Sequence, residues 1–215
     1  SQSGCGLGVA IGLEKRIPMG AGLGGGSSDC ASVLLALNEL WGLHYSRDRL
    51  AALGVELGAD VPVFVHGHSA WAEGIGEELQ TVSLRPTWYV VVKPACHVST
   101  PQVFAHPALT RDTPPLKISD CLCERGQTPP LELIECTRND CESLVRAEYG
   151  AVNEVFSWLA QFGTPRMTGT GAGVFVAFED ENHAIRCRQS LPSNLQSFVT
   201  RGLNVSPQPM PDEVG

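Results

Sequence analysis

The stretch PMGAGLGGGSSDCA, residues 18–31, decides the fold class that the sequence predicts. Glycine has no Cβ, so a glycine-rich loop lets backbone N–H groups converge at close range on an anion. Residues 9–13 before it alternate at strand period, and residues 28–41 after it repeat apolar side chains at helical spacing. Strand, glycines and helix in this order predict a phosphate-binding loop, whereas composition alone would suggest a flexible Gly/Ser linker.

Two general phosphate-loop patterns fit these residues incompletely. Gly20, Gly22 and Gly25 satisfy GxGxxG, but the approach to the turn carries charged residues and Pro18 where a dinucleotide fold has a buried strand. The pattern GxxxxGK[ST] fits from Gly20 to Gly25, except that Gly26 replaces its lysine. The loop therefore lacks the point charge that this second pattern places on the terminal phosphates.

Composition excludes several classes of function. The chain has 215 residues and 43% hydrophobic content, which is enough for one large or two modest domains with real cores. Its formal net charge of −8 argues against nucleic acid as a partner, because phosphate-backbone binding needs clustered Lys and Arg. No apolar run reaches the roughly 18 residues of a membrane span, and no signal pattern is seen, so a soluble cytoplasmic protein without a membrane partner is expected.

The cysteine and histidine residues do not predict a metal centre. The eight cysteines have no paired CxxC spacing, and reduced thiols are expected. His66 and His68 have no cysteine partners at ligand spacing, and the sequence HGH is interpreted as a hairpin turn.

Hydrophobic periodicity predicts an α+β chain with two layers. Residues 107–131, rich in proline and polar side chains, are predicted to be a mobile loop or a helical insertion. The least periodic crossing point lies near residues 80–87, and the chain is divided there into domains 1–84 and 85–215. The other predicted elements are a helix over 46–58, a strand, turn and strand over 58–74, a strand over 88–93, helices within 139–159, a turn and strand over 166–178, a helix over 181–191 and a strand over 195–203.

Three ordered motifs resemble the kinase superfamily that includes galactokinase, homoserine kinase and mevalonate kinase. Residues 18–38 resemble its second motif, LGADVPVFVHGHSAWAEGIGE at 57–77 its acid-bearing segment, and RMTGTGAGVFVAF at 166–178 its third motif. RNDCE at 138–142 also matches. Three glycines before two serines are similar to the branch that acts on a cytidyl diphosphate-linked methylerythritol in non-mevalonate isoprenoid biosynthesis. The resemblance runs from residue 1 to about 209 and implies a two-domain α+β small-molecule kinase, with residues 1–84 as the ATP-binding domain and 85–215 as the substrate-side domain.

The resemblance implies ATP as phosphate donor and Mg²⁺ as its counterion. In such kinases the γ-phosphoryl group passes to a substrate hydroxyl, and catalysis rests on positioning and charge stabilisation. Ser27 or Ser28 would contact Mg²⁺, while Asp29 is assigned to stabilising the helix through its dipole. The residues expected to bind ATP are Pro18, Met19, Gly20, Ala21, Gly22, Leu23, Gly24, Gly25, Gly26, Ser27 and Ser28.

The resemblance also assigns residues to the acceptor. Asp60, in GAD, matches the catalytic aspartate, which accepts or orients the proton of the substrate hydroxyl; without the resemblance Asp60 is a turn or helix-cap residue. Phe104 would stack on the cytosine ring, with a core phenylalanine as the alternative. The residues expected to contact the substrate are Thr100, Phe104, Gly169, Thr170 and Gly171.

The match lacks one part of the family pattern. The family ordinarily begins with a further N-terminal segment that carries a catalytic lysine, and neither Lys15 nor Lys93 lies in a matching motif. We therefore expect a fragment with low solubility and little activity alone, as a monomer or weak homodimer. Two alternatives stay open: another kinase of the superfamily, or a nucleotide-binding module that does not catalyse.

Overall fold

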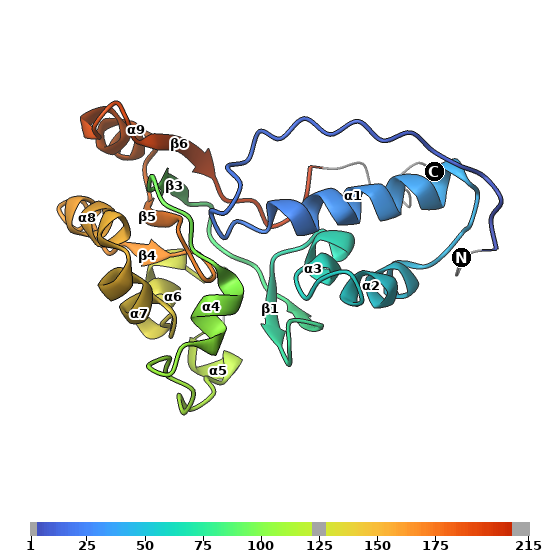
Figure 1. Cartoon of the computed structure of the whole chain (residues 1–215), viewed down its shortest axis with the longest axis horizontal. Coiled ribbons are helices and arrows are strands. Elements are labelled where there is room, and N and C mark those ends of the chain that lie inside the picture. The colour runs from blue at the N-terminus through green and yellow to red at the C-terminus, as the bar shows by residue number, and fades with distance from the viewer. Residues whose placement is uncertain (1–3, 122–127, 208–215) are drawn as a thin grey trace. The chain divides into compact units, whose positions relative to one another are not determined.

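The computed structural model describes residues 4–121 and 128–207, which divide into two compact units (Figure 1). The first unit contains residues 4–16, 24–82 and 203–207, and the second contains residues 17–23 and the described part of 83–202. The main division between the units falls after residue 82. Residues 17–23 belong to the second unit, so the chain crosses between units within the glycine-rich stretch.

Helices α1 (Gly25–Leu40), α2 (Arg47–Val55) and α3 (Val61–His66) pack together in the first unit. Helix α1 begins three residues before the predicted start at Ser28. Ser46 caps α2 as its residue type predicts, since its side chain accepts a hydrogen bond of 3.2 Å from the Arg49 amide. The buried core of the unit consists of Ala31, Leu50, Ala51, Val61 and Val65.

The segment interpreted as a strand turning at HGH is helix α3, so that prediction is wrong. Pro62 stands in the first turn, where a missing N–H costs no helical hydrogen bond, and Gly67 ends the helix with φ 72°. A hairpin follows, in which β1 (Ala70–Glu73) pairs antiparallel with β2 (Glu78–Thr81). A short apolar run is compatible with either a strand or a buried helix, and here packing against α1 and α2 selects the helix.

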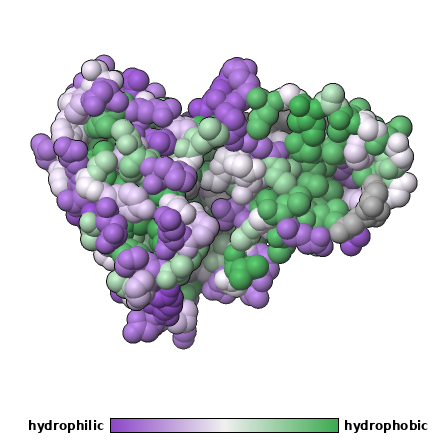
Figure 2. All heavy atoms as spheres, in the orientation of Figure 1, coloured by the Kyte–Doolittle hydropathy of each residue, from purple (hydrophilic) through white to green (hydrophobic). Residues whose placement is uncertain are grey.

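Residues 4–16 form no strand, although the alternation at 9–13 predicts one. The segment is extended and exposed, with Ile11 58% and Leu13 63% accessible, and it pairs with no strand in the described part of the chain. Residues 9–13 line an apolar groove of about 610 Å³ along α1, and Figure 2 shows apolar side chains gathered on this unit. Alternation indicates which side chains share a face, but a strand also needs a hydrogen-bonded partner.

The second unit is built on an antiparallel sheet with strand order β4–β5–β3–β6. Val90 pairs with Val176 on one side and Val199 on the other, so these side chains share one face of the sheet. That face packs against α7 (Glu142–Glu148), α8 (Gly150–Leu159) and α9 (Glu181–Ser190) to form the larger core. The strands are β3 (Trp88–Lys93), β4 (Arg166–Met167), β5 (Val174–Phe178) and β6 (Gln196–Arg201).

Three shorter helices complete the second unit. Helix α4 (Thr100–Ala105) follows β3, and α5 (Ile118–Cys121) and α6 (Pro130–Cys136) lie in and beside the region predicted as a loop or insertion, of which residues 122–127 fall outside the described part. No helix among the described residues is long and apolar enough to cross a membrane.

Candidate functional site

The glycine-rich stretch has two halves that differ in their hydrogen bonds. The fastened half, residues 20–23, lies in the second unit against the turn at 168–173. Gly20 O accepts a hydrogen bond of 3.1 Å from the Ala172 amide, and Ala21 O accepts one from Thr168 Oγ1. The open half, residues 24–28, lies in the first unit and begins helix α1.

The close approach of two backbones explains why the fastened half contains glycine. Gly22 has φ 68°, and a Cβ built there would lie 2.3 Å from Thr168 O. A Cβ at Gly173 would lie 2.3 Å from Ala21 O, so glycine is required on both sides of this contact. These glycines therefore serve the packing of the loop on the turn.

The turn at 168–173 is itself ordered by hydrogen bonds. The Thr168 amide donates to Gly173 O at 2.9 Å, and the Gly171 amide donates to Thr168 O at 2.8 Å. The hydroxyls of Thr170 and Thr100 lie 2.7 Å apart. Of the residues predicted to contact substrate, Thr170 and Thr100 are therefore brought together, with Gly169 and Gly171 flanking Thr170 in the same turn.

Phe104, the predicted stacking residue, is not a core side chain. It lies on α4, four residues after Thr100, and is 57% exposed. Its carbonyl oxygen accepts a hydrogen bond of 2.6 Å from Arg111. The exposed ring offers an aromatic surface on the second unit, as a stacking role requires.

The open half has the chemistry of an anion site. Gly24 occupies the N-cap position of α1 with φ 66°, no side chain caps the helix, and no acidic residue stands in its first turn. A Cβ at Gly24 would lie 2.9 Å from the Phe64 ring, which excludes a capping side chain there. The amides of Gly25, Gly26 and Ser27 therefore have no helical acceptor and point along the positive end of a 16-residue helix.

Asp60 lies in the same unit as the open half, two residues after Gly58, which lies near Ser27. A Cβ built on Gly58 would lie 3.8 Å from Ser27 Oγ, and Asp60 follows two residues later at the N-cap position of α3. The Asp60 side chain is exposed and makes no capping hydrogen bond. Its carboxylate therefore does not serve the helix-cap role that its position alone suggests.

The lysines nearest to these motifs are engaged elsewhere. Lys15 Nζ forms an ion pair with Asp29 Oδ2, which ties the exposed N-terminal segment to α1. Lys93 Nζ lies 3.5 Å from both Pro94 O and Cys96 O. The pairing of Lys15 with Asp29 was not evident from the sequence, because 14 residues separate them without any shared periodic element.

The thiols of Cys30, next to the glycine-rich stretch, and of Cys141, in RNDCE at 138–142, are not activated nucleophiles. Burial raises the pKa of the Cys30 thiol on α1. Burial, and to a smaller extent the carboxylate of Asp140, raises the pKa of the Cys141 thiol. Both therefore stay protonated near neutral pH, and a protonated thiol is a poor nucleophile.

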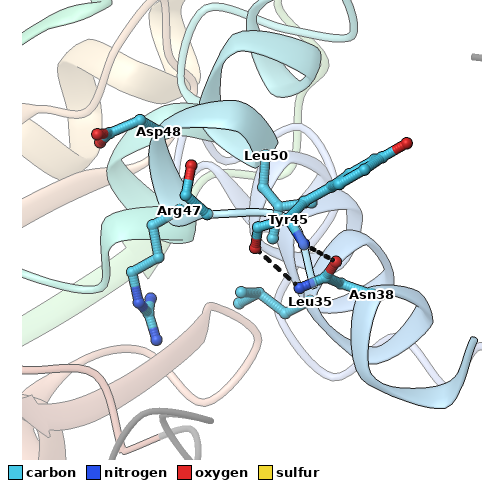
Figure 3. A pocket seen from close by; sticks show the side chains of 7 residues that line it. Leu35, Asn38, Tyr45, Arg47, Asp48 and Leu50 are labelled. Carbon is cyan, nitrogen blue, oxygen red and sulfur yellow. Dashed lines mark hydrogen bonds between the residues drawn. The ribbon is translucent and has the colours of Figure 1, made fainter. Parts of the chain in front are cut away.

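A separate cavity of about 290 Å³ beside the connection between α1 and α2 is structural (Figure 3). The Asn38 side chain donates to Tyr45 O at 3.1 Å and accepts from the Tyr45 amide at 2.9 Å. Arg47 donates to Val65 O on α3. These side chains therefore form hydrogen bonds with backbone atoms of the same unit and stabilise the connection between α1 and α2.

Two family models match the chain. The model described as GHMP kinases N terminal domain matches residues 1–68, and the model described as GHMP kinases C terminal matches residues 124–197. Together they cover more than half of the chain.

Three curated relatives of the chain carry the same name. A 4-diphosphocytidyl-2-C-methyl-D-erythritol kinase from Marinomonas sp. is 49% identical over 94% of this chain, and one from Alkalilimnicola ehrlichii is 51% identical over 95%. The kinase of the same name from Chromobacterium violaceum is 48% identical over 96% of this chain. The chain spans 62%, 66% and 70% of the length of these three relatives.

Solved structures share the fold. A crystal structure of 4-(cytidine 5'-diphospho)-2C-methyl-D-erythritol kinase matches with a TM-score of 0.70 and 36% identity, covering 87% of this chain and 68% of that one. Mevalonate kinase of L. major, in complex with R-mevalonate, matches with a TM-score of 0.56 and 14% identity, covering 86% of this chain and 66% of that one. At that identity the second match concerns the fold alone.

Proposed function

The chain belongs to the GHMP kinase family, and on that premise we propose that it takes part in transfer of the γ-phosphoryl group of ATP to the 2-hydroxyl of 4-diphosphocytidyl-2-C-methyl-D-erythritol. The choice of substrate rests on relatives of that name at 48–51% identity. The product would enter isoprenoid biosynthesis. The observation that carries the proposal is the open half, whose free amides and uncapped helix suit a phosphate.

The open half would hold the triphosphate of ATP through backbone amides. Gly26 leaves open space where a side chain would stand, since a Cβ there meets no atom within 4 Å, and a phosphate can approach the backbone closely. The hydroxyl of Ser27 or Ser28 would contact Mg²⁺, a hard cation that takes oxygen ligands, most of them from phosphates and water. Mg²⁺ would neutralise charge on the phosphates during transfer.

The residues that the sequence assigns to the acceptor are proposed for the following roles. Asp60 would accept or orient the proton of the attacking hydroxyl, a role that its free carboxylate suits. Phe104 would stack on the cytosine ring, while Thr100 and the turn residues Gly169, Thr170 and Gly171 would hydrogen-bond the substrate.

Substitution Asp60→Asn tests this assignment. Transfer of labelled phosphate from ATP to the cytidyl substrate is expected to fall by a factor of about 10² to 10⁴, because the neutral amide cannot accept the proton. The affinity for ATP, measured by calorimetry, is expected to stay within about twofold. Asp48→Asn is the matched control, because Asp48 is also an exposed aspartate at the start of a helix in the first unit. Near-normal transfer by Asp60→Asn would contradict the role.

One observation favours a second function, ATP binding without catalysis. Lys15 is paired with Asp29 and Lys93 is directed to backbone carbonyls, so both ammonium groups already have partners within their own unit. Calorimetric titration with ATP, run in parallel with the transfer assay on the unaltered chain, separates the two functions. Binding with transfer supports the kinase; binding without transfer to the cytidyl compound, mevalonate, homoserine or galactose supports the binding module.

A further inference from the structure

We propose that Asn139 and Thr168 are positioning residues that hold the fastened half of the glycine-rich stretch in its binding conformation. Asn139 belongs to RNDCE at 138–142, a motif to which the proposed function gives no role. The effect on ATP rests on the proposed function, whereas the effect on the conformation of the loop does not.

The first link runs from Asn139 to the turn. Asn139 Nδ2 donates to Met167 O at 3.1 Å and to Gly169 O at 2.7 Å, and Asn139 Oδ1 accepts from the Cys141 amide at 3.0 Å. Both amide hydrogens are thus spent on the residues that flank Thr168. Glu142, four-fifths or more buried at its side chain, adds a bond of 3.1 Å from the Met167 amide to its Oε2.

The second link runs from Thr168 to the glycines. Thr168 Oγ1 donates to Ala21 O and also lies 3.3 Å from Gly173 O. The Ala172 amide donates to Gly20 O at 3.1 Å. Because Asn139 fixes the carbonyls on either side of Thr168, the hydroxyl is presented to Ala21 from a rigid turn.

The links matter because two of the four residues of the fastened half are glycines. Gly20 and Gly22 both have positive φ, and glycine loses more conformational freedom on ordering than any other residue. Leu23 alone separates Gly22 from Gly24, the N-cap residue of α1, so a single residue joins the fastened half to the open half in the chain. Ordering the loop in advance spares ATP that entropic cost, which raises affinity without any new contact.

Substitution Thr168→Val tests the second link, because valine keeps the shape of threonine and removes the hydroxyl. In the ligand-free protein, hydrogen exchange of the Ala172 amide, followed by NMR, is expected to become about tenfold faster. The affinity for the non-hydrolysable analogue AMP-PNP with Mg²⁺ is expected to fall about tenfold, which corresponds to about 1.4 kcal/mol. Thr168→Ser keeps the donor and is expected to restore both. Asn139→Asp replaces the donor to Met167 O and Gly169 O with a carboxylate oxygen, which cannot donate. This variant is expected to show the same changes in exchange rate and in affinity as Thr168→Val.

The control is Thr87→Val in the same unit. Thr87 is 3% exposed, and its hydroxyl donates to Arg85 O at 3.1 Å, so this variant also loses a bond to a carbonyl but leaves the loop alone. A purely structural role predicts equal effects of Thr87→Val and Thr168→Val on exchange at Ala172 and on analogue affinity, and that result would overturn the proposal. If even the unaltered protein fails to bind the analogue, the proposed function fails, and the exchange rates at Ala172 still decide whether the two residues position the loop.

Discussion

The two halves of the glycine-rich stretch look alike in sequence and differ in structure. Gly20 and Gly22 lie in a backbone-to-backbone contact with the turn at 168–173, whereas Gly25 and Gly26 begin a helix whose first amides have no acceptor within the helix. In the fastened half glycine is required by a neighbouring carbonyl, and in the open half by the ligand that we propose. A glycine-rich motif can therefore combine a scaffold and a binding surface within nine residues, Gly20 to Ser28.

The largest expected effect comes from placing a Cβ in the fastened half. Gly22→Ala would force alanine to φ 68° with its Cβ 2.3 Å from Thr168 O, so the turn or the loop must move. We expect the free energy of unfolding in urea to fall by about 3 kcal/mol, from the combined cost of left-handed strain and overlap. A loss below about 0.5 kcal/mol, the range of an ordinary surface change, would show that this contact is not required.

The same change in the open half is expected to separate stability from binding. A Cβ at Gly26 meets no atom within 4 Å, and alanine favours the helix, so Gly26→Ala should raise the free energy of unfolding by about 0.5 kcal/mol. The methyl group would occupy the approach of the phosphate, and calorimetry should show about tenfold weaker binding of ATP. Unchanged affinity for ATP in this variant would remove the distinction between the halves.

The sequence predicts the second unit well because its signals are local or strongly periodic. Val152, Val155, Phe156 and Leu159 recur at helical spacing and form the buried face of α8, and the apolar run of β3 is long enough to be identified as a buried strand. These elements fold as predicted, with β3 at the centre of the sheet.

In the first unit, the secondary structure of two segments depends on residues distant in the chain, and local patterns predicted it wrongly. Val61 to His66 became a helix because Val61 and Val65 fit between α1 and α2, and Gly54 lets Val61 approach: a Cβ there would lie 2.7 Å from Val61 Cγ1. Residues 9–13 alternate as a strand does, but no described strand pairs with them. Neither result can be derived from the segment itself.

For the candidate site, residue types suggested the chemistry but not the division of roles. The sequence predicts that the glycines, Ser27 and Ser28 form one phosphate-binding loop. Nothing in their order indicates that the Thr168 hydroxyl donates a hydrogen bond to Ala21 O, 147 residues away in the chain. The roles assigned to Asp60, Phe104 and the ATP-binding residues stay predictions.

The smallest expected effect concerns the proposed contact between Phe104 of the second unit and the cytidyl substrate. Phe104→Ala removes an exposed ring, and the loss of stacking on cytosine, about 0.5–1.5 kcal/mol, should weaken binding of the cytidyl substrate roughly twofold to twelvefold, measured by calorimetry, with ATP binding unaffected. The matched control is Phe162→Ala, another exposed phenylalanine of the same unit, which stacks on Trp158. Equal weakening of both ligands by Phe104→Ala would assign the ring to a structural role.

The most direct test of the two-half account is an NMR titration of backbone amides with AMP-PNP and Mg²⁺. We predict that the amide shifts of Gly25, Gly26 and Ser27 move most, because those groups gain acceptors, while the Ala172 amide, already bonded to Gly20 O, keeps its shift. Large changes at Ala172 with none at Gly25, Gly26 and Ser27 would contradict the account.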